Sequence, residues 1–83
     1  MTIRVRLFAI MAQQAGIGEF SLTVPPGASV RAAVDEVRRR FSAVAWPAST
    51  MVAVNQEYAD PDRTLHDGDE LAIIPPVSGG MDS

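Results

Sequence analysis

The sequence predicts an α+β roll in which one main helix covers one face of a small sheet. The chain has 83 residues, enough for one domain and not two. Hydrophobic residues make up 47% of it and charged residues 20%, a balance typical of a folded domain rather than a disordered one. Apolar residues alternate with a period of two near both ends and recur at helical spacing in between, and this order predicts the roll.

The N-terminal third predicts two antiparallel strands separated by a short helix. Apolar and charged residues alternate from Ile3 to Phe8, which places Phe8 on the side facing away from the core. Good helix formers fill the stretch from Ala9 to Ala15, which ends at Gly16, a residue typical of helix C-caps. Alternation resumes from Glu19 to Val24 and predicts the second strand, which Pro25-Pro26-Gly27 closes.

Ser29 is a typical N-cap for the main helix, which we expect to span about 13 residues and to cross one face of the sheet. Apolar residues at helical spacing predict its inner face: Val30, Val34, Val37 and Phe41. The residues between them predict a solvated outer face: Arg31, Asp35, Glu36, Arg38 and Arg39.

The C-terminal half predicts three further strands. Thr50 to Val54 forms one, which Asn55-Gln56 turns into a short return strand that ends at Ala59. Asp67-Gly68-Asp69 predicts the turn before the last strand, Glu70 to Ile74. Two prolines, Pro75 and Pro76, end this strand because proline cannot continue a hydrogen-bonded ladder.

The composition excludes several classes of function. The chain has no cysteine and none of its seven basic residues is lysine, which excludes thiolate metal sites, cysteine nucleophiles and Schiff-base chemistry. A net charge of −3 matches nucleic acid poorly, and no apolar run is long enough to span a bilayer. We therefore expect a cytoplasmic protein without nucleic-acid or membrane partners. The single histidine, His66, fits a solvated turn, and we expect no metal site.

Two features point to function. Apolar residues occupy both faces of the last strand, so Ala72 and Ile74 share with Phe8 the sheet face that one helix leaves open, and such a patch is typical of a contact surface. Beyond it, Pro76 to Gly80 can extend about 17 Å, and its glycines suit passage through a channel too narrow for side chains. Such a segment is useful when its own terminal carboxyl group reacts; the alternative is a frayed terminus.

Three stretches resemble a known family in their order and spacing: Ala53 to Gln56, Leu65 to Leu71, and Ile74 to Gly80. The chain is similar over residues 1–80 to the small subunits of molybdopterin synthase, ubiquitin-like sulfur carriers related to the thiamin sulfur carrier. The resemblance implies a β-grasp (ubiquitin-like) roll, a mixed sheet of about five strands with one main helix packed on one face.

The resemblance also implies a mechanism and partners. Gly80 would carry the sulfur as a C-terminal thiocarboxylate, reached through an acyl-adenylate that a partner adenylating enzyme makes with ATP, and the chain itself would bind no cofactor. It would donate this sulfur to cyclic pyranopterin monophosphate inside the large catalytic subunit, within a heterotetramer, and would supply no catalytic side chain. The implied tail residues are Val77, Ser78 and Gly79. The implied partner-binding residues are Phe8, Ile74, Pro75 and Pro76.

One departure from the family pattern is the extension Met81-Asp82-Ser83 after the second glycine. We expect a carrier domain over 1–80, a C-terminal tail over 75–80, and an extension over 81–83 that a processing protease removes before Gly80 can react. Three alternatives stay open: a ubiquitin-like protein modifier, a sulfur carrier for another pathway (thiamin, tRNA thiolation or an amino acid), and a binding module with an inert tail.

Overall fold

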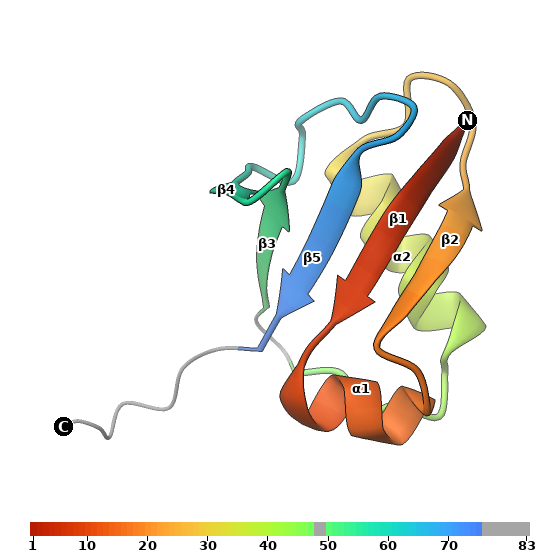
Figure 1. Ribbon diagram of the computed structural model, residues 1–83, viewed down its shortest axis with the longest axis vertical. Helices are drawn as coiled ribbons and strands as arrows, with labels where there is room; N and C mark the ends of the chain where they lie inside the picture. The colour runs from red at the N-terminus through yellow and green to blue at the C-terminus, as the bar shows by residue number, and fades with distance from the viewer. Residues whose placement is uncertain (48–49, 76–83) are drawn as a thin grey trace, which may run out of the picture.

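The computed structural model describes residues 1–47 and 50–75 (Figure 1). Its elements are, in chain order, β1 (Thr2–Leu7), α1 (Ala9–Ala15), β2 (Glu19–Thr23), α2 (Val30–Arg40), β3 (Met51–Val54), β4 (Glu57–Tyr58) and β5 (Glu70–Ile74). Every predicted element is present. The main helix is 11 residues long, shorter than predicted, because the backbone leaves the helical region at Phe41 (φ −116°, ψ 57°).

The strands form one mixed sheet in the order β2-β1-β5-β3-β4. The pairing of β1 with β5 is parallel and the pairings of β1 with β2, β3 with β5 and β3 with β4 are antiparallel. The first and the last strand therefore lie side by side in the centre of the sheet, with α2 behind it in the view of Figure 1. This arrangement confirms the predicted mixed sheet of five strands with one main helix on one face.

The core lies between α2 and the sheet. Alternate side chains of β1 and β5 point into it, as the period-two pattern predicts, and α1 closes one end with Met11. The Ser29 hydroxyl caps α2 by accepting a hydrogen bond from the backbone N–H of Ala32 at 3.1 Å. The largest fully buried side chains are Ile3, Val5, Met11, Val30, Val37, Val54, Leu65, Leu71 and Ile73.

Arg38 differs from its predicted place on the solvated outer face of the helix. Its guanidinium carbon lies 5.9 Å from the centroid of the Trp46 ring, and its Nη2 donates a hydrogen bond to the carbonyl oxygen of Pro47 at 3.4 Å. The loop that follows α2 folds back and brings Trp46 to the helix. Helical spacing contains no signal for this contact, because it depends on residues outside the helix.

Candidate functional site

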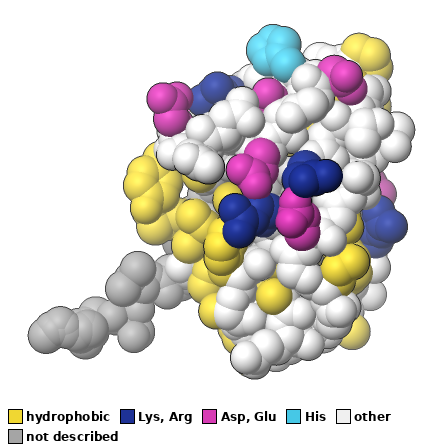
Figure 2. Space-filling model, in the orientation of Figure 1, with side chains coloured by type: hydrophobic (Ala, Val, Ile, Leu, Met, Phe, Trp, Pro, Cys, Tyr) yellow, Lys and Arg dark blue, Asp and Glu magenta, His cyan; other side chains and the backbone are white. Residues whose placement is uncertain are grey.

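The candidate site lies on the sheet face opposite α2, the face turned toward the viewer in Figure 1. Strand register brings apolar side chains together here: Met51 pairs with Ile74, and Ala53 lies between Ala72 on one side and Tyr58 on the other. We call this group the apolar patch, and its members are Phe8, Met51, Ala53, Tyr58, Ala72 and Ile74. Figure 2 shows it as a concentration of hydrophobic side chains at one side of the face.

The apolar patch contains a shallow pocket of about 260 Å³, lined by Phe8, Ala72 and Ile74 among others. Two of the patch residues are conspicuously open to solvent, since Tyr58 is 72% exposed and Met51 is 40% exposed. Exposure of large apolar side chains next to one another is typical of a contact surface. The prediction that Phe8 and Ile74 share the open face is confirmed.

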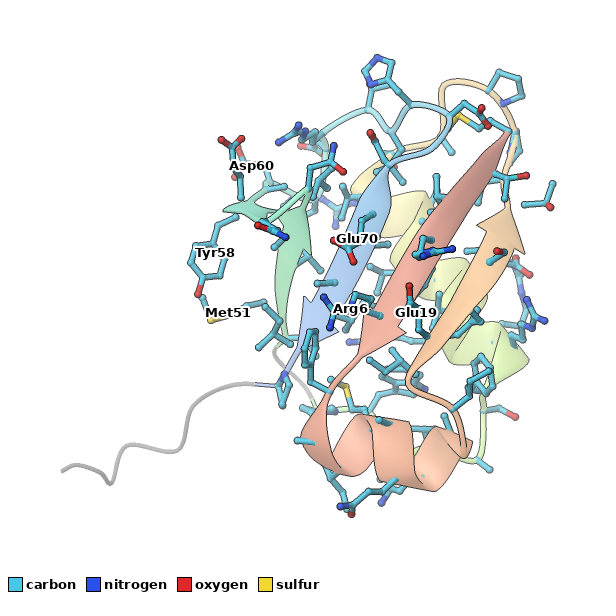
Figure 3. All side chains as sticks on the ribbon, viewed as in Figure 1. Arg6, Glu19, Met51, Tyr58, Asp60 and Glu70 are labelled. Atoms are coloured by element: carbon cyan, nitrogen blue, oxygen red, sulfur yellow. The ribbon has the colours of Figure 1, made fainter. Side chains whose placement is uncertain are left out.

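A row of charged side chains borders the apolar patch across β2, β1 and β5 (Figure 3). Arg4 pairs with Glu19 at 3.0 Å, and Arg6 pairs with Glu70 at 3.5 Å. The Arg6 guanidinium also lies 5.2 Å from the centre of the Phe8 ring, where it joins the charged row to the apolar patch. Exposed ion pairs such as these contribute little to stability, but a partner surface must match their charges.

The β3–β4 turn positions the patch relative to β5. Asn55 and Gln56 have positive φ values of 51° and 71°, the backbone of a tight two-residue hairpin turn. The Asn55 side chain then bridges to β5, because its Nδ2 donates to Asp69 Oδ1 and its Oδ1 accepts from the Glu70 N–H, both at 3.0 Å. This bridge fixes the β3–β4 turn relative to β5, and Tyr58 follows the turn on β4, across β3 from the strand that carries Ile74.

Asp69 is the one group whose ionisation the fold perturbs clearly among residues 1–47 and 50–75. Burial acts to raise the pKa of its carboxyl group. The hydrogen bonds from Asn55 and from the His66 N–H act in the opposite direction, as do the nearby charges of His66 and Arg63. Together they outweigh burial and lower the pKa below its usual value. The carboxylate therefore stays ionised and serves as an acceptor that organises the turn before β5.

Other groups considered in the sequence show no site chemistry. His66 is exposed, with its Nδ1 3.9 Å from Asp69 Oδ2, as expected for a solvated turn residue. Within the described part of the chain, no three histidine or acidic side chains are placed to hold a metal ion. The helices in that part are also too short or too polar to cross a membrane.

The sequence-predicted site residues fall into two groups. Phe8 and Ile74 line the pocket of the apolar patch, Pro75 follows directly after β5, and all three are half-buried. The other predicted residues lie outside the described residues: Pro76, Val77, Ser78, Gly79 and Gly80, with the extension Met81, Asp82 and Ser83.

Sequence reasoning missed three members of the apolar patch, Met51, Ala53 and Tyr58. The signal lay in the period of two with which side chains of a strand change face, together with the two-residue turn. These fix which side chains of the β3–β4 hairpin share a face with Ile74.

A five-stranded mixed sheet with β1 and β5 parallel at its centre, one covering helix and an apolar patch on the open face defines the ubiquitin-like β-grasp class of proteins. Residues 5–80 match the ThiS family, and the chain belongs to this family.

Named relatives agree with this assignment. The molybdopterin synthase sulfur carrier subunit of Chlamydomonas reinhardtii is 39% identical over 83 residues, covering 96% of this chain and 100% of that protein. The molybdopterin synthase sulfur carrier subunit of Arabidopsis thaliana is 37% identical over 79 residues, covering 94% of this chain and 82% of that protein.

Solved structures share the fold. SAMP1 from Haloferax volcanii superposes with a TM-score of 0.83 at 30% identity, covering 96% of this chain and 100% of that one. A chain from the complex of subunits 1 and 2 of molybdopterin-converting factor from Helicobacter pylori superposes with a TM-score of 0.70 and covers 96% of this chain and 100% of that one. Its identity of 22% shows the likeness of fold alone.

Proposed function

We propose that this chain is the sulfur-carrier subunit of a molybdopterin synthase, in which Gly80, as a C-terminal thiocarboxylate, donates sulfur to cyclic pyranopterin monophosphate during molybdenum cofactor biosynthesis. The observation that carries the proposal is the position of the apolar patch, which includes Ile74, the last residue of β5. The relatives that match almost the whole chain are named sulfur carrier subunits. The chain then contributes a docking surface and a reactive main-chain group.

The large catalytic subunit is the proposed partner of the apolar patch, in a heterotetramer. Gly80 comes six positions after Ile74, so a partner that covers Phe8 and Ile74 can receive Gly80 up to about 20 Å away. The catalytic acid, base and anion-binding groups belong to that subunit. In support, the related H. pylori chain was solved in a complex of subunits 1 and 2 of molybdopterin-converting factor.

Activation of Gly80 requires a partner adenylating enzyme that uses ATP. A terminal carboxyl group has a pKa of about 3.5, so at neutral pH it is ionised and unreactive toward nucleophiles. The Gly80 carboxylate oxygen attacks the α-phosphorus of ATP and pyrophosphate leaves, which forms an acyl-adenylate. A hydrosulfide ion then attacks the acyl carbon and AMP leaves, which forms the thiocarboxylate. We propose that this occurs in the cytoplasm, where ATP is available, and that the chain itself binds no cofactor.

A processing step must come first, because Gly80 is followed by Met81 and its carbonyl belongs to a peptide bond. We propose that a protease hydrolyses the bond between Gly80 and Met81 and so releases the Gly80 carboxylate. This proposal divides the chain into a carrier domain over 1–80, with its tail over 75–80, and a removable extension over 81–83.

The test compares two proteins, the 83-residue chain and a chain that ends at Gly80, each incubated with the adenylating enzyme, ATP and a sulfide source. Intact mass should show one oxygen replaced by sulfur in the chain ending at Gly80 and no change in the longer one. A matched control ends at Gly79. Equal conversion of all three, or no conversion of the chain ending at Gly80, contradicts the proposal.

A second candidate function is protein modification. It is favoured by the structural likeness to SAMP1, whose name stands for small archaeal modifier protein 1. In that case Gly80 would form an isopeptide bond with a lysine of a target protein. This chain has no lysine, so it could not be extended into a polymer through its own side chains. Peptide mass spectrometry of host proteins, searched for lysines joined to Gly80, distinguishes the two functions.

A further inference from the structure

A groove of about 340 Å³ runs along α2, on the other side of the sheet from the apolar patch. One wall consists of α2 residues that recur at helical spacing, and the opposite wall comes from Thr50, Val52 and Pro61. The helical wall extends from Val30 to Arg38, so the groove is about 12 Å long. That length accommodates three or four residues of extended chain.

The two walls of the groove are joined at one end, and its base is apolar. The backbone N–H of Arg31 donates to the carbonyl oxygen of Pro61 at 2.8 Å, which ties the far wall to the first turn of α2. Val30 is buried, and Val34 and Val52 are half-buried against the core. An aliphatic side chain placed in the groove would therefore bury apolar surface that α2 and β3 leave uncovered.

Arg38 gives the groove a hydrogen-bonding group. Of the five N–H donors of its guanidinium, one reaches the Pro47 carbonyl oxygen, at 3.4 Å, and the buried Nε has no partner among residues 1–47 and 50–75. No carboxylate within those residues forms an ion pair with Arg38, although Asp35 lines the same groove one turn away. The Trp46 ring lies within cation–π distance of the guanidinium, at 5.9 Å, and an arginine with free donors suits a carboxylate ligand.

The charge distribution favours an acidic ligand on this side of the molecule. Helix α2 carries four arginines against Asp35 and Glu36, a net charge of +2, so the rest of a chain with net charge −3 carries −5. The other arginine of the groove, Arg31, pairs with Asp62 at 3.1 Å, but both side chains are exposed and such pairs exchange readily with an incoming carboxylate. Acidic partners are attracted to this positive surface of an otherwise negative protein.

We propose that the groove binds a short acidic segment of a partner protein in extended form, with an aliphatic side chain against Val34 and Val52 and a carboxylate on Arg38. This goes beyond the proposed function, because it requires neither the apolar patch nor Gly80. The groove and the apolar patch lie on opposite sides of the sheet, so the chain can hold one partner in the groove while another is docked on the patch.

Trp46 is the only tryptophan in the chain and lies against Arg38, so its fluorescence reports on the groove. The 83-residue protein is titrated with an acetylated peptide of alternating leucine and glutamate, and separately with the matched leucine and glutamine peptide. We expect a saturable fluorescence change with the glutamate peptide, and binding of the glutamine peptide weaker by about tenfold or more, as expected for loss of charge-assisted hydrogen bonds.

Three variants locate the binding. Arg38→Gln should weaken binding of the glutamate peptide by about tenfold, and Val34→Asp should abolish it by placing a carboxylate in the groove while Arg38 and Trp46 are unchanged. Ile74→Asp, on the apolar patch, should bind the peptide as the unmodified protein does. Absence of a saturable change, equal binding of both peptides, or loss of binding in Ile74→Asp with retention in Val34→Asp would overturn the proposal.

Discussion

The side-chain amide of Asn55 donates a hydrogen bond to Asp69 Oδ1 at 3.0 Å. Fourteen positions separate the two residues in sequence, and the contact joins the β3–β4 turn to the residue that precedes β5. The same asparagine accepts a hydrogen bond from the N–H of Glu70, the first residue of β5. One polar side chain thus aligns the two segments that form the apolar patch.

Replacement of this amide by a carboxylate should destabilise the fold. In Asn55→Asp, the donor to Asp69 becomes a second negative charge beside it, and we expect the free energy of unfolding to fall by about 1–3 kcal/mol. Urea denaturation at neutral pH measures the loss. Gln13→Glu, an exposed change of the same charge on α1, is the control and should leave the unfolding free energy nearly unchanged.

Acid should remove the contribution of Asp69 to stability. The pKa of this carboxyl group is lower in the folded chain than its usual value of 3.8, so the unfolded chain binds the proton more tightly. The contribution is therefore complete above about pH 4 and is lost as the pH falls through the folded-state pKa. Urea denaturation midpoints are measured at a series of pH values from 6 downward. They should fall more steeply with decreasing pH for the unmodified chain than for Asp69→Asn. Asp62→Asn, at an exposed position, should follow the unmodified chain.

Ala9 begins α1 with a positive φ of 52°, a conformation that costs an alanine about 1 kcal/mol and a glycine little. Ala9→Gly should therefore raise the thermal midpoint, although glycine normally weakens helices. Ala12→Gly, inside the same helix, should lower the midpoint by the usual glycine penalty. A lower midpoint in both variants would show that Ala9 is not strained.

Ile74→Asp should prevent docking of the large catalytic subunit while leaving the fold intact. A carboxylate pressed against an apolar partner surface is left unpaired, and we expect binding weaker by about 30-fold or more, the loss typical of an interface hot spot. Titration calorimetry against the purified large subunit measures this. Ser21→Asp places the same charge on β2 of the same sheet face, away from the apolar patch, and should bind normally.

Much of the fold was accessible from the sequence because its signals are local. Alternation identified Phe8 and Ile74 as neighbours on one face, and the turn residues at Asn55-Gln56 identified the hairpin. The contacts that sequence reasoning missed are between distant segments. Trp46 reaches Arg38 only because a loop folds back, and Tyr58 joins the apolar patch only through the pairing of three strands.

The roles of residues 76–80 remain predictions from the family resemblance, because they concern chemistry outside the described residues. The length and the glycines of this segment are compatible with a reactive terminal carboxyl group and equally with a frayed terminus, and only the resemblance favours the first. What physical reasoning could predict was the apolar patch, since a strand that is apolar on both faces is unexpected in a sheet with one covering helix.

The central position of β5 also has a mechanical consequence. Its hydrogen bonds to β1 on one side and to β3 on the other run across the strand, so a force applied along the strand from Pro75 loads both ladders in shear and must break several bonds together. A pull on the C-terminal end of this domain should therefore leave its globular shape intact under tension.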